Sequence, residues 1–291
     1  MSLEPSEPQR RQGAAPLHPP GYADAVRATI GVIVAYGGSI VFAALVAAIS
    51  GAANDGLRSA GDTRAQLAIQ AVTFAGAALL LAVGLRLSHR PRERNLLAAA
   101  ARDRSPAMPP GRVLAIGLLV AGAALLVGPL ISALVPGLHN GDAPIDELGL
   151  GKGLGADIGT VLVVVGLVPL GEELLFRAVL VGAWVRAERP VLAVVSSALL
   201  FGLAHVTVGP RAVAVTVLLG ALFAAALLLS GSLGVPVFAH AFVNAIALLN
   251  GGLGGPIPVA VLVLTVLAVT VVATRNSRSV VLLPPAGTLT G

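Results

Sequence analysis

The sequence predicts an all-α polytopic membrane protein with about eight transmembrane helices. Of its 291 residues, 56% are apolar and only 11% are charged, whereas an ordinary soluble domain carries roughly 25% charged residues. The mean hydropathy is +0.90. Charges are too few to coat a water-soluble globule, and the abundance of Val, Leu and Ile excludes a disordered chain. The chain has no cysteine, which excludes disulfides and Cys-ligated metal sites.

Eight segments are expected to cross the membrane as helices. A spanning helix needs about 20 mostly apolar residues, and hydrocarbon cannot solvate free backbone groups, so each span must be helical. Six apolar runs contain no charged residue: 28–53, 65–85, 113–135, 191–208, 212–229 and 257–273. Two further runs are apolar but contain polar residues: 158–185 and 235–249.

The distribution of basic residues predicts the orientation. When the N-terminus is placed in the cytoplasm, most arginines fall in cytoplasmic segments, above all in the loop 86–112. By the positive-inside rule, both termini are expected in the cytoplasm and the protein in the cell membrane. This topology accounts for the net charge of +5. The lipid bilayer is therefore the expected partner, no nucleic acid is expected, and the oligomeric state stays open.

The domain organisation follows from these segments. We expect a disordered N-terminal tail, N-terminal transmembrane helices that include the basic loop, a polar-residue-containing core, a last transmembrane helix and a cytoplasmic C-terminal tail. The corresponding ranges are 1–25, 26–135, 158–250, 257–273 and 274–291.

Three ionisable residues lie in the middle of the span 158–185. Each ionised side chain costs about 2.5–3.5 kcal/mol at the bilayer centre. Glu173 and Arg177 are four residues apart, so an ion pair along the helix is available to them. Glu172 has no cation three or four residues further along, so we expect it to point at another helix or at water. Pro169, just upstream, is able to kink or open the helix.

Two histidines fall inside apolar segments. Phe201 precedes His205 by four residues, and His240 precedes Asn244 by four, so each pair shares a helix face. Three spans contain all the unusual polar residues, which predicts a shared polar chamber. A simpler interpretation of each histidine is a hydrogen bond between helices, and Asn244 alone is explained as an interhelical contact. The aromatic residues Trp184 and Tyr36 are expected to be interface anchors or packing residues.

One carboxylate and two imidazoles in a partly dry chamber suit the activation of a water molecule. Glutamate is able to act as the general base, while imidazole orients that base or ligates Zn²⁺. His240 and Asn244 are candidate donors to an oxyanion. Neither a nucleophile elbow nor the HExxH pattern of zinc proteases occurs.

The patterns Glu172-Glu173-x-x-x-Arg177, Phe201-x-x-x-His205 and His240-x-x-x-Asn244, in this order on successive spans, resemble the CPBP intramembrane protease family. That family includes type 2 CAAX prenyl proteases, lysostaphin-resistance-like proteins and bacteriocin self-immunity proteins. The resemblance covers about residues 158–250, and all three motifs are complete. It implies an α-helical intramembrane endopeptidase that cleaves a peptide or membrane-protein substrate.

The resemblance also implies roles for individual residues. Glu172 activates water as base or metal ligand, and His205 assists it or binds the metal. His240 and Asn244 complete the ligand set or the oxyanion site, while Glu173 and Arg177 brace the chamber together with Phe201. The expected cofactor is Zn²⁺ held by Glu172, His205 and His240, with a metal-free glutamate mechanism as the alternative.

Two other functions stay open at this point. A non-catalytic member of the same family would act as an immunity or scaffold protein that binds a peptide in an intact chamber. A proton-coupled transporter is the second alternative, because intramembrane acids and histidines also mark proton relays. Transporters, however, usually show paired repeats with broken helices, whereas the polar residues here lie in one half of the chain.

Overall fold

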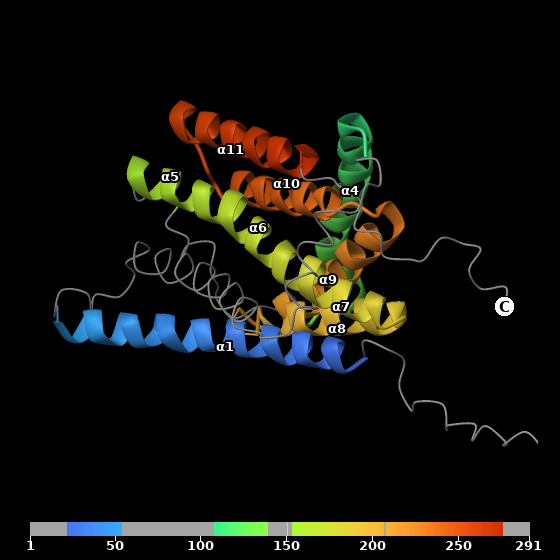
Figure 1. The fold of residues 1–291 in the computed structure, drawn as a ribbon. Helices are drawn as coiled ribbons and strands as arrows, with labels where there is room; N and C mark the ends of the chain where they lie inside the picture. The colour runs from blue at the N-terminus through green and yellow to red at the C-terminus, as the bar shows by residue number, and fades with distance from the viewer. Residues whose placement is uncertain (1–21, 54–107, 139–149, 151–152, 207, 276–291) are drawn as a thin grey trace, which may run out of the picture.

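A computed structural model describes residues 22–53, 108–138, 150, 153–206 and 208–275, with side chains described from residue 22 to 38 in the first range and throughout the others. The regular elements in these ranges are all helices, and no strand occurs among them (Figure 1). They are α1 (Tyr22–Ala53), α4 (Pro110–Leu134), a continuous helix Leu154–Arg186, α8 (Pro190–Leu203), α9 (Pro210–Ser230), α10 (Gly234–Asn250) and α11 (Pro256–Arg275).

This architecture confirms the predicted all-α membrane protein. Within the described ranges, four helices are long and apolar enough to cross a membrane: α4, Leu154–Arg186, α9 and α11. A helix also occupies each of the other predicted spans except 65–85, which lies outside the described residues. Most of the basic loop 86–112 and most of both predicted tails lie outside them as well. The orientation in the membrane stays a prediction.

The helix Leu154–Arg186, called here the central helix, is not uniformly α-helical. It consists of α5 (Leu154–Val161), the π-helical segment η3 (Leu162–Leu167), α6 (Val168–Glu172), the π-helical segment η4 (Glu173–Val181) and α7 (Gly182–Arg186). A π-helix pairs each carbonyl with the N–H five residues ahead, and it is a rare geometry that is found often at functional sites. Both glutamates lie where α6 passes into η4.

Helix α8 is shorter than its predicted span 191–208. It ends at Leu203. A turn follows, in which the His205 N–H donates a hydrogen bond of 2.9 Å to the Gly202 carbonyl. The chain then reaches Gly209, whose φ of 127° favours glycine, and Pro210, which begins α9. His205 therefore lies in a turn after the helix rather than on the helix itself.

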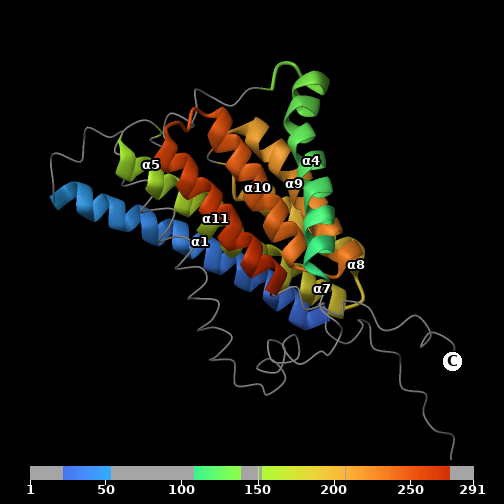
Figure 2. The same ribbon diagram turned by 90° about the horizontal axis from the view of Figure 1, so that it is seen from above.

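The central helix lies in the middle of the bundle. Its N-terminal half packs against α10 and α11, and its C-terminal half packs against α1 and α8 (Figure 1). Helix α9 packs on α8, and α4 packs on α9 and α10 (Figure 2). Two apolar clusters therefore flank the α6–η4 junction, one on each half of the central helix.

Small residues bring α8 and α9 close together. A Cβ at Gly220 would lie 2.9 Å from the Ala198 Cα and 3.1 Å from the Phe201 Cβ, so the helices touch backbone to backbone there. Close approach through small residues is the usual packing mode of membrane helices. The contact places both the Phe201 ring and the Gly220 carbonyl beside the polar residues of the central helix.

Candidate functional site

The three ionisable residues of the central helix are all buried. Glu172 is 2% exposed, while Glu173 and Arg177 are completely buried. Arg177 Nε lies 3.2 Å from Glu173 Oε2, so the ion pair expected from their spacing is present. Such a pair compensates part of the cost of burying both charges. Glu172 takes no part in that pair.

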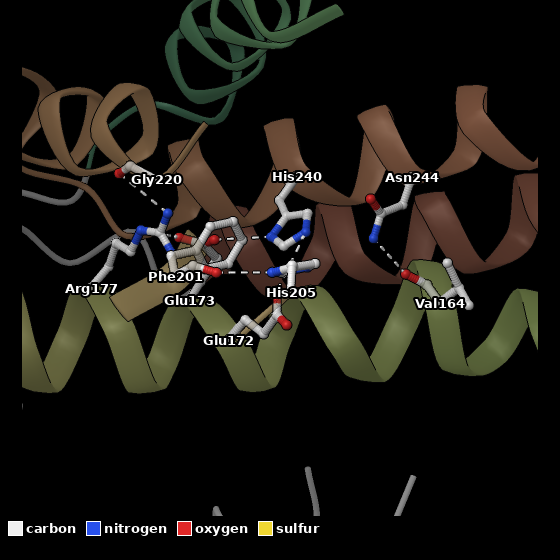
Figure 3. Close-up of polar contacts among 9 residues, drawn as sticks. All are labelled: Val164, Glu172, Glu173, Arg177, Phe201, His205, Gly220, His240 and Asn244. Carbon is white, nitrogen blue, oxygen red and sulfur yellow. Dashed lines mark hydrogen bonds and ion pairs between the residues drawn. The ribbon is translucent and has the colours of Figure 1, made fainter. Parts of the chain in front are cut away.

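His240 joins the two glutamates from the opposite helix. It lies in the second turn of α10, 6% exposed, and its Nδ1 donates a hydrogen bond of 2.9 Å to Glu173 Oε1 (Figure 3). A carboxylate only accepts hydrogen bonds, so this contact places the ring hydrogen on Nδ1. The other ring nitrogen, Nε2, faces Glu172 Oε2 at 3.7 Å. That distance is too long for a direct hydrogen bond.

Arg177 is enclosed by aromatic rings. Its guanidinium carbon lies 4.5 Å from the centroid of Phe201, 5.4 Å from Phe223 and 5.9 Å from Phe176. Nη2 donates to the Gly220 carbonyl at 3.4 Å, whereas Nε and Nη1 make no hydrogen bond to the described residues. Cation–π attraction and the ion pair with Glu173 therefore provide most of the compensation for this buried cation.

The same rings hold the His240 imidazole. Phe223 stacks on it with centroids 5.3 Å apart and an interplanar angle of 27°, and Phe201 meets it edge-on at 5.8 Å and 81°. Two rings and one carboxylate thus fix the position of His240. The aromatic enclosure keeps the local dielectric low, which strengthens the electrostatic interactions between the charged groups inside it.

His205 also lies beside the Phe201 ring. The two ring centroids are 5.1 Å apart, and His205 Nδ1 donates to the Phe201 carbonyl at 2.8 Å (Figure 3). Its Nε2 is therefore left as an acceptor. Among the described residues, His205 makes no ion pair or hydrogen bond with Glu172 or His240. The structure thus places His205 and His240 on the same phenyl ring without joining them directly.

Asn244 is engaged away from the glutamates. Its Nδ2 donates to the Val164 carbonyl in η3 at 2.8 Å (Figure 3). In the π-helical register, the Val168 N–H bonds to the Val163 carbonyl, so the Val164 carbonyl would pair with residue 169. Residue 169 is proline and has no N–H. The Asn244 amide satisfies the carbonyl that Pro169 leaves without a partner, which is the interhelical role weighed for it above.

The donor types would suit Zn²⁺, but their arrangement does not form a ligand set. Within the described part of the chain, no three His, Asp or Glu side chains lie together as a metal-holding group. Glu172 and His240 face each other, while His205 contacts Phe201 rather than either of them. The predicted set of Glu172, His205 and His240 is not assembled here, and its role as a zinc site stays a prediction.

Sequence reasoning missed the contribution of α9. Because that helix is apolar along its length, it was expected to be a plain span, yet it supplies the Phe223 ring and the Gly220 carbonyl to Arg177. Phe176, on η4 itself, was also missed. The available signal was weak: Phe223 is the one aromatic residue of α9.

We expect Asn244→Ala to lower stability, because it leaves the half-buried Val164 carbonyl without a hydrogen bond. The loss of one such bond costs about 1–3 kcal/mol. In a Pro169→Ala background, residue 169 regains an N–H that is able to pair with Val164, so the added cost of Asn244→Ala should shrink. Thermal unfolding of the four proteins in the same detergent measures this coupling.

Ser132→Ala serves as the control for removing a half-buried polar side chain, since the hydrogen-bond partners of Ser132 are the Gly128 carbonyl and Arg211 and not Asn244 or Val164. Its effect should be the same in the wild-type and the Pro169→Ala backgrounds. If Asn244→Ala lowers the stability equally in both backgrounds, the Asn244 amide does not replace the hydrogen bond that Pro169 is unable to make to the Val164 carbonyl.

Comparison with known protein families gives one match. Residues 155–246 match the family model described as type II CAAX prenyl endopeptidase Rce1-like. Comparisons with curated proteins and with solved structures give no match. The matched segment runs from α5 into α10 and contains every residue of the three motifs. This segment is thus similar to the Rce1-like type II CAAX prenyl endopeptidases, in agreement with the motif resemblance.

Proposed function

We propose that this protein is an intramembrane endopeptidase in which Glu172 activates a water molecule for attack on a peptide bond. The observation that carries the proposal is the buried pairing of Glu172 with His240 Nε2 across 3.7 Å. This gap joins two acceptors, because Glu172 Oε2 has no hydrogen-bond partner among the described residues and His240 Nδ1 already holds the ring hydrogen. The 3.7 Å separation is longer than a direct hydrogen bond, and the proposal places a water between the two groups.

A water at this position donates one hydrogen to Glu172 and the other to His240 Nε2. One of the two lone pairs on its oxygen is then directed at a substrate carbonyl carbon. As the water oxygen bonds to the carbonyl carbon, Glu172 takes the proton as general base. The C–N bond breaks in the next step, and the protonated carboxyl returns the proton to the leaving nitrogen. This proton transfer needs no side chain outside the pair.

The neighbouring residues hold this pair in position. Glu173 accepts a hydrogen bond from His240 and forms an ion pair with Arg177, so it fixes the imidazole while its own charge is balanced. His205, with Nδ1 bound to a carbonyl, offers Nε2 as a second proton acceptor. Asn244 Nδ2 has a second hydrogen beyond the one given to Val164, which makes it a candidate oxyanion donor.

The proposed substrate is a membrane-associated protein or peptide with a prenylated C-terminus, and the proposed location is the cell membrane. The family description names CAAX prenyl endopeptidases. Helices long enough to span the membrane surround the glutamates, so a substrate must reach the site from the bilayer or along its surface. Lipid-anchored substrates are concentrated there.

Glu172→Gln should abolish peptide cleavage, because the amide keeps the size of the side chain but cannot accept the proton. Loss of a general base costs about 10²–10⁴-fold in rate. The assay uses full-length protein in proteoliposomes with a farnesylated CAAX peptide, and mass spectrometry identifies the products.

The exposed Glu188 lies outside the site, so Glu188→Gln is the matched control and should cleave like the wild type. Equal product formation by Glu172→Gln and the wild type would exclude Glu172 as the base. No product from the wild type, with this peptide or with a mixture of transmembrane peptides, would exclude the endopeptidase itself.

Chelation tests whether the reaction uses the side chains alone. The proposed water activation requires only Glu172 and His240, so protein dialysed against a chelator should keep its cleavage rate and contain less than one zinc per chain. Elemental analysis and the peptide assay measure the two quantities. Two results together would contradict this and would mean that the predicted ligands hold a metal. The wild type would contain one zinc per chain that both His205→Ala and His240→Ala lose, and the activity of the dialysed protein would return only when Zn²⁺ is added.

A further inference from the structure

Helix α9 supplies an aromatic ring to the site although it contains none of the three motifs. Phe223 is completely buried, and it stacks on the His240 imidazole with ring centroids 5.3 Å apart and planes inclined by 27°. The Arg177 guanidinium carbon lies 5.4 Å from the centroid of the same phenyl ring. One side chain of α9 therefore contacts both the histidine that faces Glu172 and the cation that pairs with Glu173.

The motif residues alone do not fix the plane of the His240 ring. Glu173 holds Nδ1 at 2.9 Å, which restrains one atom of the imidazole. The last side-chain torsion of histidine has broad preferences, so one anchored atom does not determine where the other ring nitrogen points. The Phe201 ring meets the imidazole edge-on, at 81°. The nearly parallel Phe223 ring restricts the imidazole more, because tilting would press an edge of the imidazole into the phenyl face.

Small residues of two other helices pack with Phe223. It forms one buried cluster with Ala121 and Ala124 of α4 and with Ala239 of α10. Ala121 and Ala124 are three residues apart and share a face of α4, and α4 packs on both α9 and α10 (Figure 2). An alanine side chain has no rotamer to change, so these contacts hold the phenyl ring against His240.

We propose that Phe223 is a positioning residue, and that it fixes the plane of the His240 imidazole so that Nε2 stays directed at Glu172. The inference rests on the proposed function, in which the reacting water lies between these two groups. A tilted imidazole would move Nε2 away from that water and lower the rate. The proposal adds α9 to a site that the motifs limit to the central helix, α8 with the turn after it, and α10. It also gives a role to α4, which lies outside the segment that matches the family model.

Phe223→Leu tests this role, because it removes the ring and keeps an apolar side chain. Phe223→Met is the second variant, since a flexible thioether adapts to the vacated space. With the farnesylated CAAX peptide in proteoliposomes, kcat of both variants should fall about threefold to tenfold, which corresponds to the loss of one aromatic pair. KM should stay at the wild-type value, because a completely buried side chain offers the substrate no contact.

Phe238→Leu is the matched control. Phe238 is also a buried phenylalanine beside α4, where it lies against Gly117, and within the described residues its ring pairs with Phe242 rather than with His240. This variant should lower the melting temperature about as much as Phe223→Leu does, yet keep the kcat of the wild type. The comparison separates the positioning of His240 from a general loosening of the core.

Solid-state NMR in lipid bilayers provides a readout that does not need turnover. The carbon–hydrogen dipolar couplings of the His240 ring, assigned by their loss in His240→Gln, report how far the ring plane moves. These couplings should decrease in Phe223→Leu and in Phe223→Met and stay unchanged in Phe238→Leu.

A wild-type kcat in the Phe223 variants would overturn the proposal, and so would unchanged couplings or an equal loss of kcat in Phe238→Leu. A raised KM with unchanged kcat would also overturn it and would instead indicate a substrate contact. Reduced couplings in the Phe223 variants, together with no cleavage by the wild type, would refute the proposed function and leave the restraint of His240 by Phe223 standing.

Discussion

The arrangement of this protein depends on how two adjacent carboxylates are accommodated in an apolar helix. Neighbouring residues on a helix point in different directions, so Glu172 and Glu173 face different groups, and at His240 they face different ring nitrogens. Glu173 receives both the Arg177 guanidinium and the His240 Nδ1 hydrogen. This leaves Glu172 facing the acceptor nitrogen of His240 at 3.7 Å, where we propose the reacting water. The difference between a bracing and a reacting carboxylate follows from this division.

Irregular backbone geometry supports the same division. Proline at position 169 and two π-helical segments interrupt the central helix on either side of α6. Each interruption changes which backbone groups are paired, and a side chain from a neighbouring helix has to replace a lost bond, as Asn244 does for Val164. Helix α10 thus has two tasks at the central helix. Its Asn244 replaces the backbone hydrogen bond that Pro169 is unable to make, and its His240 contacts the two glutamates.

The sequence was sufficient for the local features and insufficient for those that depend on how helices cross. Apolar run lengths predicted the helices, and the four-residue spacing predicted the Glu173–Arg177 pair. Spacing does not tell which glutamate His240 meets, since this depends on the rotation of α10 against the central helix. The end of α8 before His205 and the ring of Phe223 against Arg177 were hidden for the same reason. The ring contact between Tyr36 and Phe176 likewise joins distant parts of the sequence.

The tautomer of His240 tests this account most directly. Nitrogen-15 NMR of the full-length protein in lipid bilayers, with the His240 signals assigned by their loss in His240→Gln, reports which ring nitrogen is protonated. The account predicts a hydrogen on Nδ1, bound to Glu173, and a bare Nε2 toward Glu172. A hydrogen found on Nε2 with a bare Nδ1 would contradict it, because the imidazole would then donate directly toward Glu172 and the proposed water would lose its second acceptor.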